Sequence, residues 1–257
     1  MNFQRIWALS LTRLYPLIKK GQIFQMIIGP VILTVIFGFL SEGLAEETRS
    51  TAPLILMATT VIWQLVMYPH QEITLVAISE LSSSGLTQLF STPLTKYELT
   101  AALLLPSIIT TGFVFLVCSA LMMIVHGYNP LFLGLPLIPL LINLLVFGAT
   151  FGLFAATVVV RFGEQLGHFA QLLDWFIVPV SGVYYPYDKM PEWLQFIGKL
   201  LPLSYIFGFI RGEPWALELG YGTIVFRTLV LGLFYLALVF FLFNRALEKI
   251  RMRGATS

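Results

Sequence analysis

Long apolar stretches recur along the whole chain, and they constrain its fold more than any other feature. A helix that spans a bilayer needs about 20 consecutive, mostly apolar residues. Only 11% of the 257 residues are charged and 58% are hydrophobic, a composition that suits lipid better than water. The sequence therefore predicts an all-α, polytopic membrane protein with about six transmembrane helices in a single domain, residues 1–257. The predicted spans are 23–40, 53–78, 99–125, 131–160, 165–185 and 222–243.

Prolines within two of these stretches predict kinks. Proline removes one internal hydrogen bond from a helix and crowds the preceding turn. We expect bends at Pro69 in the second span and at Pro136 and Pro139 in the fourth.

The distribution of positive charge predicts the orientation of the chain in the membrane. Loops that carry an excess of Lys and Arg remain in the cytoplasm. With the N-terminus inside, ten of the 15 basic residues fall on the cytoplasmic side and four on the other, with Arg227 inside the last span. Both termini are thus expected in the cytoplasm, with residues 244–257 as a basic cytoplasmic tail.

Residues 1–22 have the pattern of an amphipathic helix that lies on the membrane surface. At 100° per residue, Phe3, Trp7 and Leu11 share one face, whereas Arg5 and Arg13 lie on the other. Such a helix places its apolar face among lipid chains and its cationic face toward anionic headgroups. An ordinary cytosolic lead-in is the alternative.

The predicted cytoplasmic link 79–98 is the first segment that could carry function. If its first half is helical, Leu81, Leu86, Leu89 and Phe90 share a broad face that Pro93 brings to an end. Thr95 and Glu98 then have the spacing of a capping box that opens the third span. A short helix held between two spans could pass a push from a cytosolic partner into the membrane; a solvated amphipathic loop is the alternative.

A second cytoplasmic turn, 160–167, brings Arg161 and Glu164 together. Contact with a partner is one interpretation of this pair. A pair of interfacial anchor charges is the other.

The external segment 186–221 is too apolar and aromatic for a free loop, and its prolines cut it too short to span. Such segments are typical of re-entrant or interfacial pieces. We expect two short helices, near 191–200 and 203–211, between the fifth and sixth spans. Its aromatic residues could form an exit gate or simply the aromatic belt of a membrane protein. The candidate gate residues in and beside it are Tyr184, Tyr185, Trp193 and Phe207.

Ionisable side chains within predicted spans include His70, Glu72, Asp174 and Arg227. A charge in a bilayer costs at least about 2.5 kcal/mol, so these groups should face a cavity, a neighbouring helix or one another. Asp174 is a candidate pathway residue or a structural hydrogen-bonding group. Asn143 is expected to join two helices.

Motifs for enzyme chemistry are missing from the sequence. It contains no G-x-x-x-x-G-K-[ST] phosphate loop, no H-E-x-x-H and no G-x-S-x-G. We therefore expect no catalytic residue, no metal site, no cofactor bound by this chain and no ATP hydrolysis by the chain itself.

Two motifs give the chain a resemblance to a known family. The first is E-L-x-x-x-G-L-x-x-L-x-S-T-P-L-T, from Glu80 to Thr95. The second is S-G-V-Y-Y-P-Y-x-x-M-P-x-W-L-Q, from Ser181 to Gln195, followed by L-P-L-S-Y at 201–205. In this order and spacing they resemble the coupling helix and the external signature of the membrane subunits of type 2 ABC exporters.

The resemblance implies a transport mechanism and partners. Two permease chains would pair, as a homodimer, and two copies of a cytosolic ABC ATPase would bind ATP and Mg²⁺ on the cytoplasmic face of a bacterial plasma membrane. The substrate would be a hydrophobic or amphipathic drug, lipid or lipid-linked glycan, and nucleic acid would not be a partner. The residues that would contact the ATPase are Glu80, Leu81, Gly85, Leu86, Leu89, Phe90, Pro93, Arg161 and Glu164.

Two other functions were weighed against this one. An ion-coupled transporter or channel would use Asp174, Glu72 or His70 as ion sites. A membrane-embedded enzyme acting on lipid would need clustered acids or a nucleophile with its base, and the sequence shows neither.

Overall fold

The structure is a computed structural model of the chain, and it describes residues 3–19, 22–48, 52–80 and 95–254. The described residues form helices and connecting turns, with no strand among them, so the predicted all-α fold is confirmed. The helices are α1 Phe3–Lys19, α2 Gln22–Thr48, α3 Ala52–Glu80, α5 Lys96–His126, α6 Leu137–Phe162, η1 Glu164–Leu166, α7 Gly167–Gln171, α8 Leu173–Ser181, η2 Tyr187–Lys189, α9 Glu192–Gly198, α10 Pro202–Ile210, α11 Pro214–Leu219 and α12 Tyr221–Gly254.

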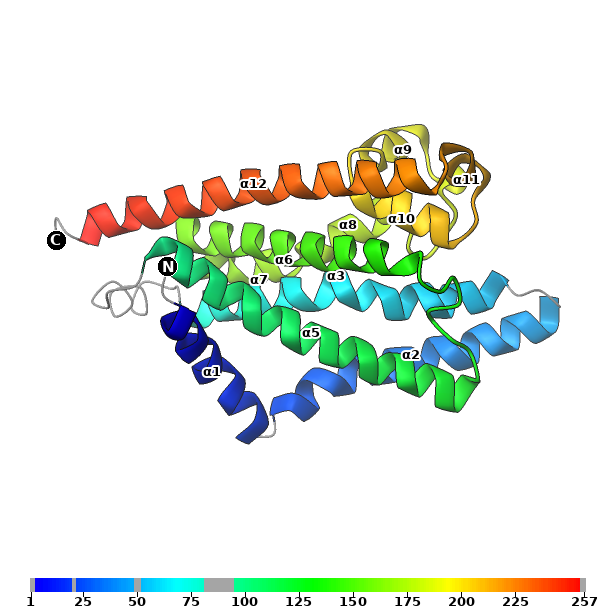
Figure 1. Ribbon diagram of the computed structural model, residues 1–257, viewed down its shortest axis with the longest axis horizontal. Helices are drawn as coiled ribbons and strands as arrows, with labels where there is room; N and C mark the ends of the chain where they lie inside the picture. The colour runs from blue at the N-terminus through cyan, green and yellow to red at the C-terminus, as the bar shows by residue number, and fades with distance from the viewer. Residues whose placement is uncertain (1–2, 20–21, 49–51, 81–94, 255–257) are drawn as a thin grey trace.

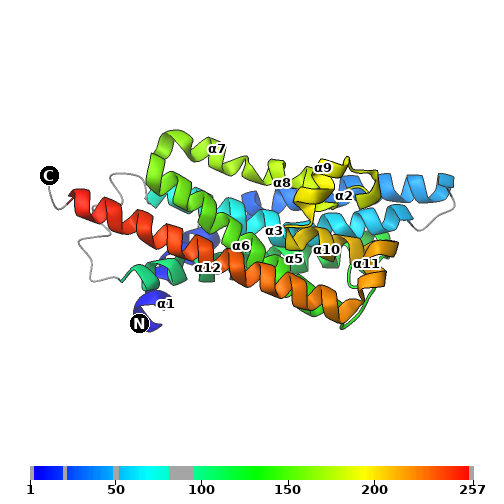
Figure 2. The same ribbon diagram turned by 90° about the horizontal axis from the view of Figure 1, so that it is seen from above.

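Five long helices, α2, α3, α5, α6 and α12, run along the long axis of an elongated bundle (Figure 1). Helix α3 packs against α2, α5 and α6, and α6 packs against α12. The view from above shows α7 and α8 beside α3 and α6 (Figure 2). Helix α3 is thus the central element of the bundle.

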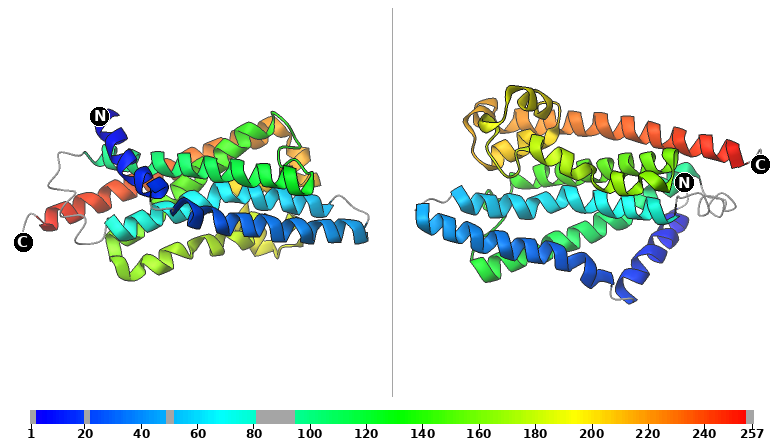
Figure 3. Two further views of the ribbon diagram at one scale, coloured as in Figure 1. Left: turned by 90° about the horizontal axis from the view of Figure 1, so that it is seen from below. Right: turned by 180° about the vertical axis from the view of Figure 1, so that it is seen from behind.

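The bundle has two distinct ends (Figures 1 and 3). At the first, which we call the terminal end, lie α1, the last turns of α3, α6 and α12, and the first turn of α5. At the opposite end lie η2, α9, α10 and α11, which with their connections form residues 182–220 and which we call the cap. The expectation that the N-terminal helix and the tail share one side of the membrane is consistent with this arrangement.

Four of the long helices, α2, α5, α6 and α12, are long and apolar enough to cross a membrane, and a fifth span is possible if the bent pair α9–α10 counts as one. The expected number was about six. Helix α3 has sufficient length, 29 residues, but it carries Gln64, His70 and Glu72 and lies largely inside the bundle. The rest of the difference between the expected and observed numbers of spans comes from the predicted fifth span, 165–185.

The predicted continuous span 165–185 is wrong, because the structure divides this region into η1, α7 and α8. Gly163 ends α6 with φ of 91°, a conformation that glycine adopts without steric cost. Leu172 interrupts the next segment: its N–H bonds the Phe169 carbonyl and its own carbonyl accepts from Trp175. The prediction that this region is apolar is correct, but the breaks at Gly163 and Leu172 were not predicted.

The predicted kinks at Pro136 and Pro139 are also wrong. Helix α6 begins at Leu137, not at residue 131, after a turn in which Gly134 has φ of 68°. Pro136 caps the helix and Pro139 lies in its first turn, where backbone N–H groups have no partner within the helix and proline is tolerated. Pro69, by contrast, lies inside α3.

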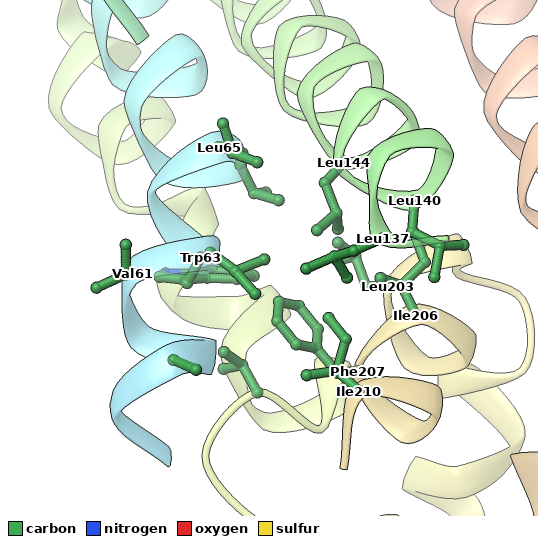
Figure 4. Close-up of a cluster of buried hydrophobic side chains, with 14 of the residues drawn as sticks. Val61, Trp63, Leu65, Leu137, Leu140, Leu144, Leu203, Ile206, Phe207 and Ile210 are labelled. Atoms are coloured by element: carbon green, nitrogen blue, oxygen red, sulfur yellow. The ribbon is translucent and has the colours of Figure 1, made fainter. Parts of the chain in front are cut away.

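The core near the cap is a cluster of large apolar side chains from α3, α6 and α10 (Figure 4). Trp63 of α3 packs beside Phe207 of α10, with ring centroids 6.1 Å apart. Leu140 and Leu144 of α6 are fully buried in the same cluster. Burying such side chains favours packing of the short helix α10 into the bundle rather than exposure at its edge.

Helices α3 and α6 approach closely at two glycines. A Cβ at Gly148 would lie 2.6 Å from the Leu65 carbonyl oxygen, and one at Gly152 would lie 2.8 Å from that of Pro69. Any side chain at these positions would separate the two helices. The glycines therefore fix the distance between the two best-packed helices of the bundle.

Helix α1 packs on the bundle through a face different from the predicted apolar one. Ile6 and Ser10 are buried, whereas Trp7 and Leu11 remain 42% and 44% exposed. The Arg13 guanidinium donates to the Ala102 carbonyl of α5 over 2.5 Å. The partial exposure of these apolar side chains is consistent with the predicted surface helix.

Candidate coupling end, buried polar pair and external cap

The first turn of α5 confirms the predicted capping box. The Thr95 hydroxyl accepts from the Glu98 N–H at 3.3 Å, and the Glu98 carboxylate accepts from the Thr95 N–H at 3.0 Å. Both contacts satisfy N–H groups that a helix start would otherwise leave unpaired. The start of α5 is thereby fixed directly after the link that was predicted to couple.

Most of the predicted coupling residues lie outside the described residues. Helix α3 ends at Glu80, whose side chain is not described, and the structure resumes at Thr95. The predicted residues between these points are Leu81, Gly85, Leu86, Leu89, Phe90 and Pro93.

The second predicted coupling turn does lie at the terminal end. Its Gly167 contacts Ile78, near the end of α3, so closely that a Cβ there would lie 2.7 Å from the isoleucine side chain. Arg161 is exposed, with its guanidinium 5.7 Å from the centre of the Phe162 ring. Of the Glu164 side chain nothing is described. The structure thus places this turn beside the last turn of α3.

A surface ion pair joins two further helices at the same end. The Lys96 ammonium lies 2.5 Å from a Glu248 carboxylate oxygen, which ties the first turn of α5 to the end of α12. Together with the Ile78–Gly167 contact, it groups the ends of α3, α5, α6 and α12 around the two ends of the link.

A buried polar pair lies farther inside the bundle, between α3 and the broken segment α7–α8. His70 and Asp174 are 0% and 3% exposed, with Nδ1 and the nearer carboxylate oxygen 4.0 Å apart. His70 Nε2 contacts the Ala170 carbonyl at 3.1 Å, and Gln71 donates to Asp174 at 3.2 Å. Of the three expected settings, a cavity, a neighbouring helix or one another, the structure shows His70 and Asp174 facing one another between helices; sequence reasoning missed Gln71.

Other polar side chains join neighbouring helices. Thr110 of α5 donates a short hydrogen bond to Glu72 of α3. Asn143 of α6 donates to Thr228 of α12 at 3.0 Å, so its predicted role between helices is confirmed. Within the described ranges, no group of three or more His, Cys, Asp or Glu could hold a metal ion.

The four candidate gate residues occupy different environments in and beside the cap. Tyr184 stacks on Phe37 of α2, with ring centroids 5.8 Å apart, and the Tyr185 hydroxyl donates to the Pro179 carbonyl. Trp193 is 65% exposed, whereas Phe207 is fully buried in the core beside Trp63. They do not line one common surface.

The predicted external helices are present as α9 and α10, joined at an angle of 103°. Helix α11 and η2 were not predicted. Arg211, directly after α10, donates to the carbonyls of Gly182 at 2.9 Å and Val183 at 2.6 Å. Partial burial lowers the pKa of Arg211, against the effect of nearby Glu213. This arginine thus joins the end of α10 to the first residues of the cap.

Glu213 is the matching buried acid of the cap. Its carboxylate accepts from the Tyr187 N–H at 3.1 Å and from the Trp215 indole at 2.6 Å. Burial, with a smaller contribution from Tyr205, raises the pKa of Tyr187 to about 12, so its phenol is a neutral donor to the Gln195 carbonyl. Sequence reasoning missed Arg211 and Glu213 because their partners are mostly backbone atoms.

Comparison with protein families identifies the chain. The sequence profile of the family described as "ABC-2 type transporter" matches residues 6–213, which extend from α1 through α10. The chain belongs to the ABC-2 type transporter family. No curated protein sequence matches the chain.

Family membership explains why the structure is a helical membrane bundle. An ABC-2 type transporter chain of this kind is a membrane subunit for transport. The matched range includes the link between α3 and α5 and most of the cap. It ends before α11 and α12.

Proposed function

We propose that this ABC-2 type transporter chain is one half of the membrane part of an ATP-driven exporter. Two copies pair in a bacterial plasma membrane, with both termini in the cytoplasm, and two copies of a separate ABC ATPase supply ATP hydrolysis with Mg²⁺. The cargo is a hydrophobic or amphipathic molecule, such as a drug, a lipid or a lipid-linked glycan.

The grouping of helix ends around the link supports this proposal most directly. The link leaves α3 at Glu80 and enters α5 at Thr95, where the capping box makes the start of the helix rigid. A partner that binds residues 81–94 is therefore connected directly to two long helices, α3 and α5. The Ile78–Gly167 contact connects α3 to the α6–α7 turn, and the Lys96–Glu248 pair connects α5 to α12, so a displacement of the link would also reach these elements.

The centre of the bundle is suited to moving as one body. Gly148 and Gly152 keep α6 against α3, and interlocked side chains transmit displacement because protein interiors are close-packed. If α3 is displaced at the terminal end, α10 would move with it, because Phe207 of α10 is buried against Trp63 of α3. Opening of an exit near the cap is the expected result.

Leu89→Asp tests the coupling step. With the ATPase co-reconstituted, a charge on the predicted apolar face of the link should weaken ATPase docking and reduce transport by at least about tenfold, since about 1.4 kcal/mol lost corresponds to that factor. Ser84→Asp adds the same charge to the same segment outside that face and should retain most activity. Full transport by Leu89→Asp would remove the coupling assignment.

Topology gives an independent test. A cysteine placed at Ser83, in a variant whose natural Cys118 is replaced by alanine, should react only with a thiol reagent that reaches the cytoplasmic side. Labelling by a reagent confined to the exterior would invert the proposed orientation.

The His70–Asp174 pair favours a second candidate, an ion-coupled transporter. Two buried ionisable groups 4.0 Å apart could exchange a proton during transport. Asp174→Asn would abolish flux driven by an ion gradient in liposomes without ATP if this candidate is correct. Unchanged ATP-driven transport by the same variant would leave Asp174 as a structural group.

A further inference from the structure

The cap and the start of α12 enclose a pocket that none of the proposed transport steps uses. Its volume is about 520 Å³, and three aromatic side chains, Tyr187, Tyr205 and Trp215, form part of its wall. Two cations, Lys199 from the cap and Arg227 from α12, also line it, against a single acid, Asp188.

Tyr205 contacts both basic residues of the pocket, one through its ring and the other through its hydroxyl. The Arg227 guanidinium lies 5.9 Å from the centre of the Tyr205 ring, and the Tyr205 hydroxyl donates to the Lys199 carbonyl at 3.1 Å. The Asp188 carboxylate lies 3.8 Å from the neighbouring Lys189. Among the described residues, no carboxylate pairs with Arg227 or Lys199, so the pocket carries uncompensated positive charge beside aromatic surface.

Helix α12 has a second arginine that serves as an internal comparison. Arg245 lies 18 residues after Arg227, five full helical turns, and so on the same face. At 1.5 Å per residue the two arginines are about 27 Å apart, close to the roughly 30 Å thickness of a bilayer's hydrocarbon core. Each arginine also stacks on an aromatic ring, Arg245 on Phe241 at 5.8 Å. This spacing would place the two arginines at opposite surfaces of a bilayer.

An apolar stripe connects them. Val230, Phe234, Leu238 and Phe241 follow Arg227 at helical spacing on the same face and are 48%, 60%, 42% and 57% exposed. From Arg227 to Leu238 the stripe extends about 16 Å, the depth of one leaflet. Only the Arg227 end of this stripe opens into the pocket.

We propose that the pocket binds the anionic headgroup of a membrane phospholipid, whose acyl chains lie along the Val230–Leu238 stripe. The two cations would contact the phosphate, and Arg227 can do so with two parallel N–H donors. Basic pockets between transmembrane helices on the cytoplasmic side of membranes bind anionic headgroups, and the same pairing of cations with a phosphate is available to this pocket at the opposite end of the bundle. Binding of this lipid would join the cap to α12 and needs neither the ATPase nor the transported cargo.

Lipid binding to the purified chain alone tests this inference. Native mass spectrometry from detergent, titrated with phosphatidylglycerol or with phosphatidylcholine of the same acyl chains, should show one site that prefers the anionic lipid by about tenfold. Arg227→Gln and Lys199→Gln should each weaken that site by a similar factor. Arg227→Lys keeps the charge without the planar guanidinium and should lose less.

Arg245→Gln is the matched control, because it removes one charge from the same face of the same helix at a residue that does not line this pocket. Equal losses in Arg227→Gln and Arg245→Gln, or equal binding of the two lipids, would overturn the inference. Soluble glycerol 3-phosphate that binds as tightly as the lipid would show that free phosphate is the ligand and would also overturn it. None of these outcomes bears on ATP-driven transport, so the inference and the proposed function can fail separately.

Discussion

The two ends of the bundle are held together by different kinds of contact. In the cap, buried or half-buried charged groups bond backbone atoms: Arg211 binds the carbonyls of Gly182 and Val183, and Glu213 binds the Tyr187 N–H. At the terminal end the Lys96–Glu248 pair joins two helices through side chains that are 34% and 55% exposed. The cap is therefore a rigid unit, whereas the terminal end has contacts that a partner can exchange for its own.

The largest effect should follow from breaking the cap. Glu213→Ala leaves the Tyr187 N–H and the Trp215 indole without their acceptor in a buried site, which should cost about 2–4 kcal/mol of folding stability. The checks are thermal unfolding in detergent and protease cleavage between residues 182 and 220.

Glu218→Ala is the control for this prediction, because Glu218 is an exposed acid of helix α11, which begins directly after Glu213. Its stability should stay near that of the original protein. If Glu213→Ala were equally stable and equally protease-resistant, the description of the cap as a rigid unit would be wrong.

A pair of glycine substitutions compares the two ends directly. In Gly198→Ala the new methyl group would lie 2.9 Å from the Tyr187 ring and 3.0 Å from the Val180 carbonyl oxygen, neither of which can move freely. We expect a loss of about 1–3 kcal/mol, as for other overpacked sites. In Gly167→Ala the methyl group meets the side chain of Ile78 alone, which can shift.

Gly167→Ala should therefore lose less than about 1 kcal/mol, because side-chain adjustment is cheaper than backbone displacement. Chemical unfolding of both variants under one set of conditions gives the comparison. A larger loss at Gly167 than at Gly198 would reverse the order of rigidity assigned to the two ends.

The smallest effect should come from the exposed ion pair. Lys96→Gln and Glu248→Gln, alone and combined, should leave thermal stability nearly unchanged because solvent and salt screen such a pair. Any coupling between the two substitutions should disappear as salt is raised. Coupling that persists at high salt would show that this end is held as firmly as the cap.

The sequence predicted those features that depend on local pattern. The spacing of Thr95 and Glu98 was sufficient to predict the capping box of α5, and the apolar, proline-divided segment 186–221 predicted the two short helices α9 and α10. The apolar runs gave the long helices, although α6 starts later than expected because hydropathy cannot detect the turn at Gly134.

The features that were missed depend on atoms far apart in the chain. Hydrophobicity does not distinguish a continuous span from the broken segment η1–α7–α8, since both bury the same side chains. The partners of Arg211 are carbonyls 28 and 29 residues away, and backbone carbonyls leave no trace in a sequence. Asp174 was a candidate pathway residue or a structural hydrogen-bonding group, and nothing in the sequence indicated that Gln71 of α3 would be its donor.

Helix α12 is continuous over 34 residues, a length of about 51 Å, and it contacts both ends of the molecule. Its Tyr235 hydroxyl donates to the Leu200 carbonyl near the cap, and its Glu248 meets Lys96 at the other end. A helix without a break behaves as a lever, so a small sideways displacement of its tail becomes a change of tilt beneath the cap. A bulky domain fused close to residue 254 would thus alter the position of the cap, at the other end of α12.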